Sequence, residues 1–365
     1  MALAPAAEAQ TSPPVADQLP PVTVTSPEQA PSKRSKPAQR PRHAANGRKP
    51  VAPATSQPAP AGSGIVGGSA TSQASGLQPA AASTQQFSGA EVNARPFSRP
   101  GEALEVVPGL IVTQHSGEGK ANQYFLRGFN LDHGTDLAIT VDGMPVNMPT
   151  HGHGQGYADI NFLIPELIRS VDVRKGPYYA DKGDFASAGT VDINYLNGLP
   201  RNIVELTAGS FGYQRAMAAG STKLGDGTLL AAFEANKYNG PWQVPDDVRK
   251  LNGVLRYSRG TATDGFALTA MAYSNGWNST DQVAQRAIDQ GLIDRYGSLG
   301  PTDGGTSSRF SLSGSWAQSS EYGQSKANAY VIRSSLQLYN DFTYFLDDPV
   351  NGDQFSQTDK RTVYG

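Results

Sequence analysis

Apolar and polar side chains alternate with a period of two residues through most of the second half of the chain. The clearest segment is 308–318, in which Phe310, Leu312 and Trp316 alternate with serine and arginine side chains. This alternation predicts β-strands with one apolar face. About seven antiparallel strands of roughly ten residues each are expected. The predicted strands cover 202–209, 213–224, 228–238, 248–258, 266–274, 308–318 and 327–339.

Short turns and long connections alternate between these predicted strands. The turns at 224–228 and 259–265 are short, whereas the connections 239–247 and 279–307 are long. Transmembrane β-barrels have this pattern, with short turns at one membrane surface and longer loops at the other. A soluble β-sandwich would show similar alternation, so the pattern alone leaves both architectures open.

Segment 95–200 has a different pattern, in which short apolar strands end at glycine-rich corners. Gly128, Gly143 and Gly176 follow predicted strands where the chain must turn sharply, and glycine tolerates the positive φ of such turns. A small mixed sheet with short helices, an α+β domain, is expected. Strands are predicted at 110–114, 123–129, 137–141, 170–174 and 190–195, and short helices at 99–110 and 162–170.

Residues 1–94 differ from the rest of the chain in composition. Thirteen of the 26 prolines lie in residues 1–60, and the first aromatic residue is Phe87. A segment without aromatic residues cannot bury enough apolar area to offset its conformational entropy, so residues 1–86 are expected to be disordered. We predict a disordered tether over 1–94 and a folded domain that begins near Phe97.

Charge is unevenly placed along the chain, although the formal net charge is only −2. Segment 32–50 carries seven lysines and arginines and no acid. Such a run can bind nucleic acid, but a solvated, self-repelling linker is the more common case, so no nucleic-acid partner is expected. Cysteine is absent, which by itself places no limit on the cellular compartment.

A signal-peptidase motif occurs close to the first residue. Ala7-Glu8-Ala9 has the required A-x-A form, but only six residues precede it, without a basic or a full apolar region. Either Met1 is a misassigned start within a longer signal peptide, or the match arose by chance in an alanine-rich stretch. The first interpretation is preferred because the rest of the chain implies export.

The order of the corner motifs in 95–200 resembles the plug domain of TonB-dependent outer-membrane receptors. In that family "RG" follows the second strand, "DG" the third and "RGP" the fourth. The last plug strand usually follows "G-G-V-(I/V)-N-I", of which AGTVDIN at 188–194 is a softened version. The matching corner motifs here are Arg127-Gly128, Asp142-Gly143 and Lys175-Gly176-Pro177.

The resemblance implies a plug at 95–200 that sits inside a large transmembrane β-barrel, and barrel strands at 201–365. The family's barrel has twenty-two strands, and barrel diameter grows with strand number. About seven strands cannot close around a plug of this size. We therefore expect an incomplete barrel and read the chain as a tether, a plug and the first third of a barrel wall.

The resemblance also identifies a TonB box in the tether. Its two prolines prevent a helix, and its alternating valines and threonines favour an extended backbone that can pair with the sheet edge of another protein. The alternative is an ordinary piece of linker. The predicted box consists of Leu19, Pro20, Pro21, Val22, Thr23, Val24 and Thr25.

Charged residues occur on or beside the apolar strands of the predicted plug. Inside a barrel such charges need partners, because an unpaired buried ion is costly. The resemblance favours contacts that hold the plug to the barrel wall, and simple exposure to water is the alternative. The predicted contact residues are Arg127, Glu166, Arg169, Arg174 and Lys175.

Four of the five histidines lie in the predicted plug, within or beside its most polar, glycine-rich segments. Together with nearby acids they could supply nitrogen and oxygen ligands to Zn²⁺, Cu²⁺ or Ni²⁺. A protonated cluster could instead recognise an anion or act as a pH switch, and a purely structural role also stays open. The candidate ligand or metal residues are His115, Asp132, His133, Asp136, His151 and His153.

The function implied by the resemblance is TonB-dependent uptake of a scarce ligand, such as a metal ion, metal chelate or siderophore, across the bacterial outer membrane. The expected partners are TonB with its inner-membrane energising complex, an extracellular small ligand and outer-membrane lipid, with the tether in the periplasm. No resident cofactor is required, because a transition metal or its chelate would be cargo.

An enzyme is not expected, since neither G-x-S-x-G nor H-E-x-x-H occurs. The rival function is that of a non-transport structural or adhesive β-protein with a disordered basic arm. It predicts that deletion of residues 22–25 has no effect, whereas the transport function predicts lost uptake with ligand binding retained.

Overall fold

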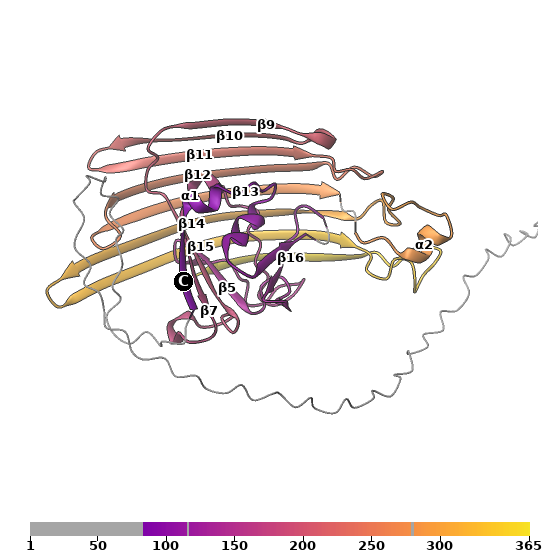
Figure 1. Cartoon of the computed structure of the whole chain (residues 1–365), viewed down its shortest axis with the longest axis horizontal. Helices are drawn as coiled ribbons and strands as arrows, with labels where there is room; N and C mark the ends of the chain where they lie inside the picture. The colour runs from indigo at the N-terminus through magenta and orange to yellow at the C-terminus, as the bar shows by residue number, and fades with distance from the viewer. Residues whose placement is uncertain (1–82, 115–116, 279–280) are drawn as a thin grey trace, which may run out of the picture. The chain divides into compact units, whose positions relative to one another are not determined.

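The computed structural model describes residues 83–365, apart from 115–116 and 279–280 (Figure 1). The predicted TonB box, the basic run at 32–50 and the signal-peptidase motif lie outside the described residues, and so does His115. Among the described residues, no helix is long and apolar enough to cross a membrane.

The plug contains two small sheets. Its larger sheet is mixed and has the strand order β1-β7-β8-β5-β6, in which β5 runs parallel to β8 and the other neighbours are antiparallel. Its smaller sheet has the order β2-β3-β4. The strands are β1 (Ser83–Ser88), β2 (Leu110–Thr113), β3 (Gln123–Leu126), β4 (Phe129–Asn130), β5 (Leu137–Val141), β6 (Met144–Pro145), β7 (Ile168–Lys175) and β8 (Gly189–Tyr195).

The helices of the plug are short. Ser88 and Glu91 form a capping box at the start of α1 (Gly89–Asn93), and Pro100 occupies the first turn of the 3-10 helix η1 (Pro100–Val106). The helix predicted over 162–170 is reduced to the single turn η2 (Pro165–Leu167), because β7 already begins at Ile168. The plug also contains η3 (Ala180–Lys182), whereas η4 (Ser210–Gly212) and α2 (Gln285–Asp289) lie in connections between the later strands of the chain.

The ordered plug begins earlier than the sequence predicted. β1 pairs with β7 along its whole length, from Ser83 opposite Lys175 to Ser88 opposite Ser170, and α1 follows directly. The predicted start near Phe97 is therefore wrong. A polar edge strand such as STQQFS is held by backbone hydrogen bonds and, apart from Phe87, buries little, so it leaves no alternating pattern in the sequence.

The corner glycines adopt the backbone conformation that their turns require. Gly128, Gly143 and Gly176 have φ of 83°, 80° and 90°. Arg127 and Asp142, which precede two of them, also have positive φ, of 54° and 49°. Two successive residues with positive φ are typical of the type I′ turn, whose twist matches that of β-hairpins, and these turns join β3 to β4 and β5 to β6.

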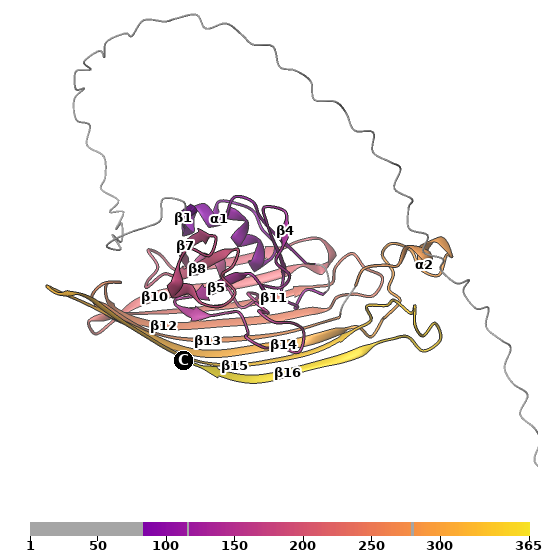
Figure 2. The same cartoon turned by 90° about the horizontal axis from the view of Figure 1, so that it is seen from below.

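The rest of the chain forms one antiparallel sheet of eight strands, in which each strand pairs with its neighbours in sequence (Figure 2). We call this sheet the wall. Seven of its strands were predicted, and β16 was missed because FSQTDKRTVY is polar on both faces. The strands are β9 (Ile203–Ala208), β10 (Gln214–Leu224), β11 (Gly227–Tyr238), β12 (Val248–Gly260), β13 (Gly265–Asn278), β14 (Gly304–Ser320), β15 (Gly323–Asn340) and β16 (Phe355–Tyr364).

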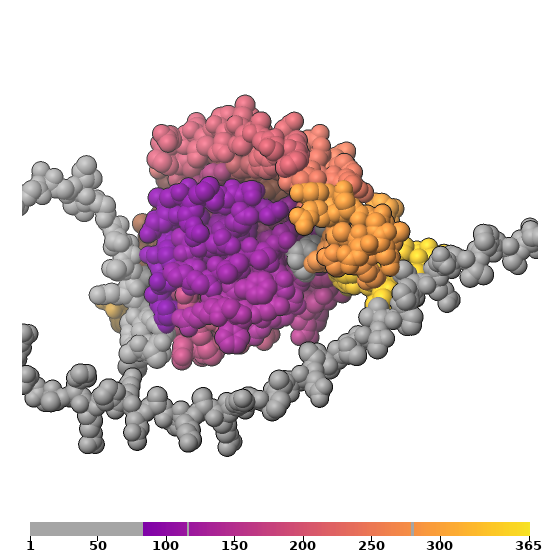
Figure 3. All heavy atoms as spheres, turned by 45° about the vertical axis from the view of Figure 1, so that its right-hand side comes forward, coloured from indigo at the N-terminus to yellow at the C-terminus, as the bar shows by residue number. Residues whose placement is uncertain are grey.

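The plug packs against one face of the wall (Figures 2 and 3). Apolar side chains on this inner face of the wall, such as Val254, Met271 and Ile332, belong to the same buried cluster as the plug core. Short turns join β10 to β11, β12 to β13 and β14 to β15 at one end of the wall. Longer connections lie at the other end, at 239–247, 279–303 and 341–354. The sequence predicted the first two, the second with the bounds 279–307, and missed the third together with β16.

Candidate functional site

Three of the candidate histidines gather around Tyr157 in the plug. The His151 ring stacks on the Tyr157 ring, with centroids 4.2 Å apart and planes 2° from parallel. The centroids of His133 and His153 lie 5.8 and 5.7 Å from that of Tyr157, and 5.0 Å from each other. The loop that carries His151 and His153 is closed by a β-bridge between Met148 and Tyr157, which brings its histidines back to this ring. We call this group the histidine cluster.

The hydrogen bonds of the cluster define its protonation. His133 is buried, and its Nδ1 lies 3.0 and 3.1 Å from two backbone carbonyl oxygens, so Nδ1 carries the proton and donates. His151 Nδ1 accepts a hydrogen bond from the backbone N–H of His153, at 3.1 Å. Burial lowers the pKa of His151 to about 4. The His151 imidazole is therefore neutral near pH 7, and because Nδ1 accepts, its proton is on Nε2.

The candidate acids are placed differently from each other. The half-exposed Asp132 lies beside His133, with 3.7 Å between Oδ1 and Nε2. Asp136 points elsewhere and accepts hydrogen bonds from the hydroxyls of Thr135 and Ser187, which hold its pKa below the usual range. Within the described ranges, no group of three or more histidines and acids is arranged to hold a metal ion.

The loop of the histidine cluster is attached to β16. His153 Nδ1 lies 2.7 Å from Gln357 Oε1, and the Gln357 amide in turn donates to the Gly152 carbonyl at 3.0 Å. The Gly152 N–H donates to Asp359 Oδ2 at 3.1 Å. Sequence reasoning missed these wall partners because it missed β16 itself.

The longer connections of the wall approach the same end of the plug. Phe342, in the connection between β15 and β16, lies 6.5 Å from His153 between ring centroids, and Lys120 Nζ lies 5.2 Å from the Phe342 centroid. Lys120 is only 1% exposed, and burial lowers its pKa to about 8. The histidine cluster, a buried amine and an aromatic ring are thus collected at the long-connection end.

A second group of polar contacts ties the plug to the wall further along the interface. The Arg215 guanidinium on β10 binds both Glu166 carboxylate oxygens, at 2.8 and 3.0 Å. It also binds Glu234 at 2.6 Å, and Lys250 binds Glu234 at 2.8 Å. We call these four residues the Glu166 latch. The predicted plug–wall contact of Glu166 is present.

None of the other four predicted contact residues forms a hydrogen bond or ion pair with a wall residue that the structure describes. Lys175 Nζ donates to the Pro108 carbonyl at 2.7 Å, and the Arg174 guanidinium stacks 4.5 Å from the ring centroid of Tyr179, both within the plug. These predictions are wrong because β7 lies between β1 and β8, where its side chains meet other plug residues. Arg127 and Arg169 are exposed, and neither makes a hydrogen bond or ion pair with any wall residue that the structure describes.

A second latch was not predicted. Asp142, expected only as a turn residue, accepts a hydrogen bond from the Arg256 guanidinium at 2.8 Å. The same guanidinium binds Asn197 Oδ1 at 3.0 and 2.9 Å. Burial raises the pKa of Asp142 although Arg256 opposes this shift. A usable signal was present, because Lys250, Asn252 and Arg256 occupy alternate positions of one strand and so point to a polar inner face.

Further polar contacts join the plug to β14, on the β16 side of the two latches. Arg309 lies 4.7 Å from the centroid of the Phe162 ring. Asp159 accepts a hydrogen bond from the Ser307 hydroxyl at 3.3 Å, and burial raises its pKa to about 6. The plug is therefore held by charged and polar contacts spread across β10 to β16, in addition to apolar packing.

The described geometry matches known proteins. Residues 77–190 match the family model of the TonB-dependent receptor plug domain. Similar solved structures are "Copper transporter OprC" (19% identity, TM-score 0.55), the ferric yersiniabactin uptake receptor FyuA from Yersinia pestis (16%, 0.56) and the ferric citrate transporter FecA (14%, 0.58). They cover 77%, 70% and 70% of this chain, which spans only 41%, 41% and 40% of theirs.

These likenesses show the fold, a plug-like mixed sheet followed by a large antiparallel sheet that resembles part of a receptor barrel. The matched family consists of receptors and transporters and not of enzymes, in agreement with the sequence prediction.

Proposed function

We propose that this protein takes part in TonB-dependent uptake of a metal ion or metal chelate across the bacterial outer membrane. The match of residues 77–190 to the plug domain of TonB-dependent receptors supports this proposal. The observation that carries the choice of cargo is the histidine cluster around Tyr157, at the end of the wall where the long connections lie. In outer-membrane barrels that end faces the outside.

The chemistry of the cluster suits such a cargo. Imidazole nitrogen is a good ligand for zinc, copper, iron and nickel, and the hydrogen bonds of His133 Nδ1 to backbone carbonyls leave Nε2 as the ring nitrogen that can bind a metal. His133 and His153 lie next to each other, so their rings can approach one metal complex together. The buried Lys120 amine nearby adds a donor for an oxygen-rich chelate. Copper and two ferric complexes occur in the names of three similar proteins, which supports this class of cargo.

The proposal assigns the remaining parts of the chain to energy coupling. Residues 19–25 pair with TonB in the periplasm by adding a strand to its sheet. The tether leads from there to β1, an edge strand of the plug sheet, so a pull on the tether acts first on the pairing of β1 with β7. The two latches hold the plug against the wall until that pull arrives.

Metal binding by the purified protein tests the cargo proposal. Calorimetry with Zn²⁺, Cu²⁺ and Ni²⁺ is expected to show micromolar binding that is lost in a His133→Ala/His151→Ala/His153→Ala variant. His43→Ala is the matched control, because it removes a histidine that lies in the tether and not in the cluster. Equal metal binding by the triple variant and the control would overturn the assignment of the cluster to cargo.

A further inference from the structure

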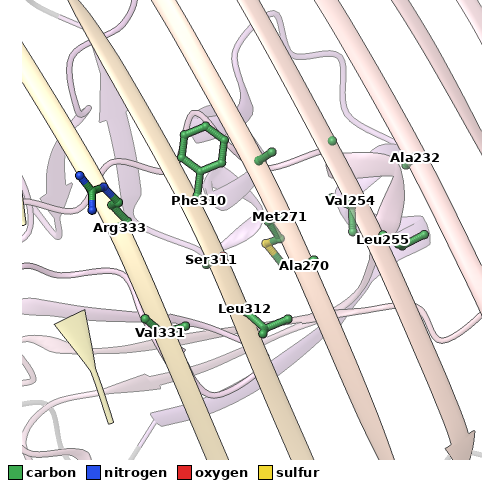
Figure 4. Close-up of a pocket in the computed structure, with 12 residues that line it drawn as sticks. Ala232, Val254, Leu255, Ala270, Met271, Phe310, Ser311, Leu312, Val331 and Arg333 are labelled. Atoms are coloured by element: carbon green, nitrogen blue, oxygen red, sulfur yellow. The ribbon is translucent and has the colours of Figure 1, made fainter. Parts of the chain in front are cut away.

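The outer face of the wall, which points away from the plug, is apolar over most of its strands. Several of its large side chains are about half exposed or more, from 46% for Leu312 to 80% for Leu206. Between them lies a shallow hollow lined by small and apolar residues of β11 to β15, with Phe310 and Arg333 at one side (Figure 4). An exposed apolar surface that spans many strands is typical of contact with lipid chains.

Arg333 interrupts this apolar surface on β15. The strand register places Phe233, Gly253, Ala272 and Phe310 in one row across β11 to β14, and Arg333 continues that row. The row ends at Thr362 on β16. A guanidinium therefore occupies a position at which four neighbouring strands carry an aromatic or small apolar residue.

Lys360 joins Arg333 from the next strand. It lies opposite Ser335, two residues along β15 from Arg333, and both cations are exposed on the outer face. Diagonal neighbours of this kind lie about 7–8 Å apart across a strand pair, within reach of two long side chains. The Thr362 hydroxyl lies directly opposite Arg333 and is also exposed. We call Arg333, Lys360 and Thr362 the outer cationic patch.

No acid on the wall balances these charges. Asp359, adjacent to Lys360 in sequence, is buried on the inner face and binds Arg361 and the Gly152 N–H. Across the part of the chain that the structure describes, neither Arg333 nor Lys360 forms an ion pair or a side-chain hydrogen bond. Two exposed cations beside an apolar outer surface therefore lack an anion from the described residues.

On β13 to β15, the strands beside the patch, the outer face changes from apolar to polar residues toward the long connections, and the patch lies at this change. The next outward-facing row lies two residues closer to the short turns. It contains Leu255, Ala270, Leu312 and Val331, which are all apolar. Two residues beyond Arg333, Ser308 is opposite Ser335 and Ser274 is opposite Ser308, so the outer face is polar there on β13 to β15, whereas Leu251 continues the row as an apolar residue on β12. A charge at that boundary is level with the headgroups of the leaflet on the long-connection side.

We infer that the outer cationic patch binds the phosphate of a lipid headgroup in the outer leaflet. Arginine can hold a phosphate through two parallel N–H donors, and a lysine and a hydroxyl beside it complete the contacts to its remaining oxygens. The inference rests on the membrane location contained in the proposed function, but it does not depend on the histidine cluster or on the cargo.

Lipid retention by the purified protein tests the inference. The protein is placed in nanodiscs with phosphorylated lipid A or with lipid A from which the phosphates have been removed, and bound lipid is counted by native mass spectrometry. We expect preferential retention of the phosphorylated lipid, and about a tenfold loss of that preference in an Arg333→Gln/Lys360→Gln variant. Arg333→Lys is expected to retain part of it.

The matched control is Lys237→Gln/Arg249→Gln, which removes two cations from the outer face of β11 and β12. Equal loss in the control, or equal retention of both lipids by the unchanged protein, would overturn the inference. So would full displacement of the lipid by inorganic phosphate, which would indicate a simple anion site, or dimerisation that only the Arg333/Lys360 variant loses. Metal binding is unchanged in this variant, so failure of the cargo proposal would be seen separately.

Discussion

The Glu166 latch allows a quantitative prediction about how firmly the plug is held. Glu166→Gln keeps the shape of the side chain but removes its charge from the Arg215 guanidinium. Both side chains are mostly buried, with exposures of 17% and 11%, and two charge-assisted hydrogen bonds join them. Hydrogen bonds to charged groups contribute about 1.5–3 kcal/mol each.

We expect Glu166→Gln to lower the free energy of plug unfolding by an amount near the lower end of about 1.5–3 kcal/mol. Arg215 retains Glu234 at 2.6 Å and Glu205 at 3.2 Å, so its charge is not left unpaired. The expected loss of plug stability is about 2 kcal/mol. Arg215→Met is expected to cost about 3–5 kcal/mol, because it leaves the buried Glu234 carboxylate, only 1% exposed, with Lys250 and the Asn252 amide as partners and removes the cation that binds Glu166.

Trp277 provides the assay, because it lies on the wall and touches the plug. It is 5% exposed, and its ring packs directly on Gly119. With Trp242 and Trp316 replaced by phenylalanine, Trp277 emission follows plug release during urea titration. A loss of about 2 kcal/mol would lower the urea midpoint by roughly 1–2 M for a domain of this size.

Asp181→Asn is the matched control, because it removes an exposed plug carboxylate. If Glu166→Gln lowers the midpoint no more than Asp181→Asn does, the latch does not hold the plug. The reasoning would also fail if the loss in Arg215→Met did not exceed the loss in Glu166→Gln.

Three further predictions concern other parts of the chain. Gly119→Ala would bring a Cβ to 2.0 Å from Trp277 Cε3, so the loop or the ring must move, at a cost of about 1–3 kcal/mol; an unchanged Trp277 emission spectrum would contradict this. The His151 pKa is about 4 when folded and about 6.5 when unfolded, so docking of its loop is fully stable above pH 6.5 and weakens as the pH falls toward 4. Hydrogen exchange at the Gly152 amide checks this, and His151→Phe is expected to abolish the pH dependence. Deletion of 22–25 is expected to abolish energised uptake while ligand binding is retained; uptake at the normal rate would instead favour the structural or adhesive alternative.

Local pattern was sufficient to predict most strands of this protein. The predicted strand 137–141 coincides with β5, and seven strands of the wall lie where the two-residue alternation was found. The alternation arises because one face of each of these strands is buried and the other is exposed. Asp142-Gly143 likewise predicts its own turn, because both residues tolerate positive φ.

The alternation of apolar and polar residues did not reveal strands that are held mainly by backbone hydrogen bonds. β1 and β16 lie at the edges of their sheets and carry polar residues on both faces. Their backbone hydrogen bonds to β7 and β15 do not depend on side-chain type. These strands therefore show no alternation of apolar and polar residues in the sequence. The same omission hid Gln357 and Asp359, which hold the loop of the histidine cluster.

The sequence by itself determined the class of the domain and the types of residue available for chemistry. Only the tertiary structure decided which of them meet. Glu166 and Arg215 are separated by 49 residues, Asp142 and Arg256 by 114, and Gly152 and Gln357 by 205. Pairing over such separations depends on strand register and on packing of the plug against the wall, whereas turn geometry and face alternation depend on a few adjacent residues. For this reason Gly128 and Gly143 were predictable from their neighbours, and the partners of Lys175 and Arg256 were not.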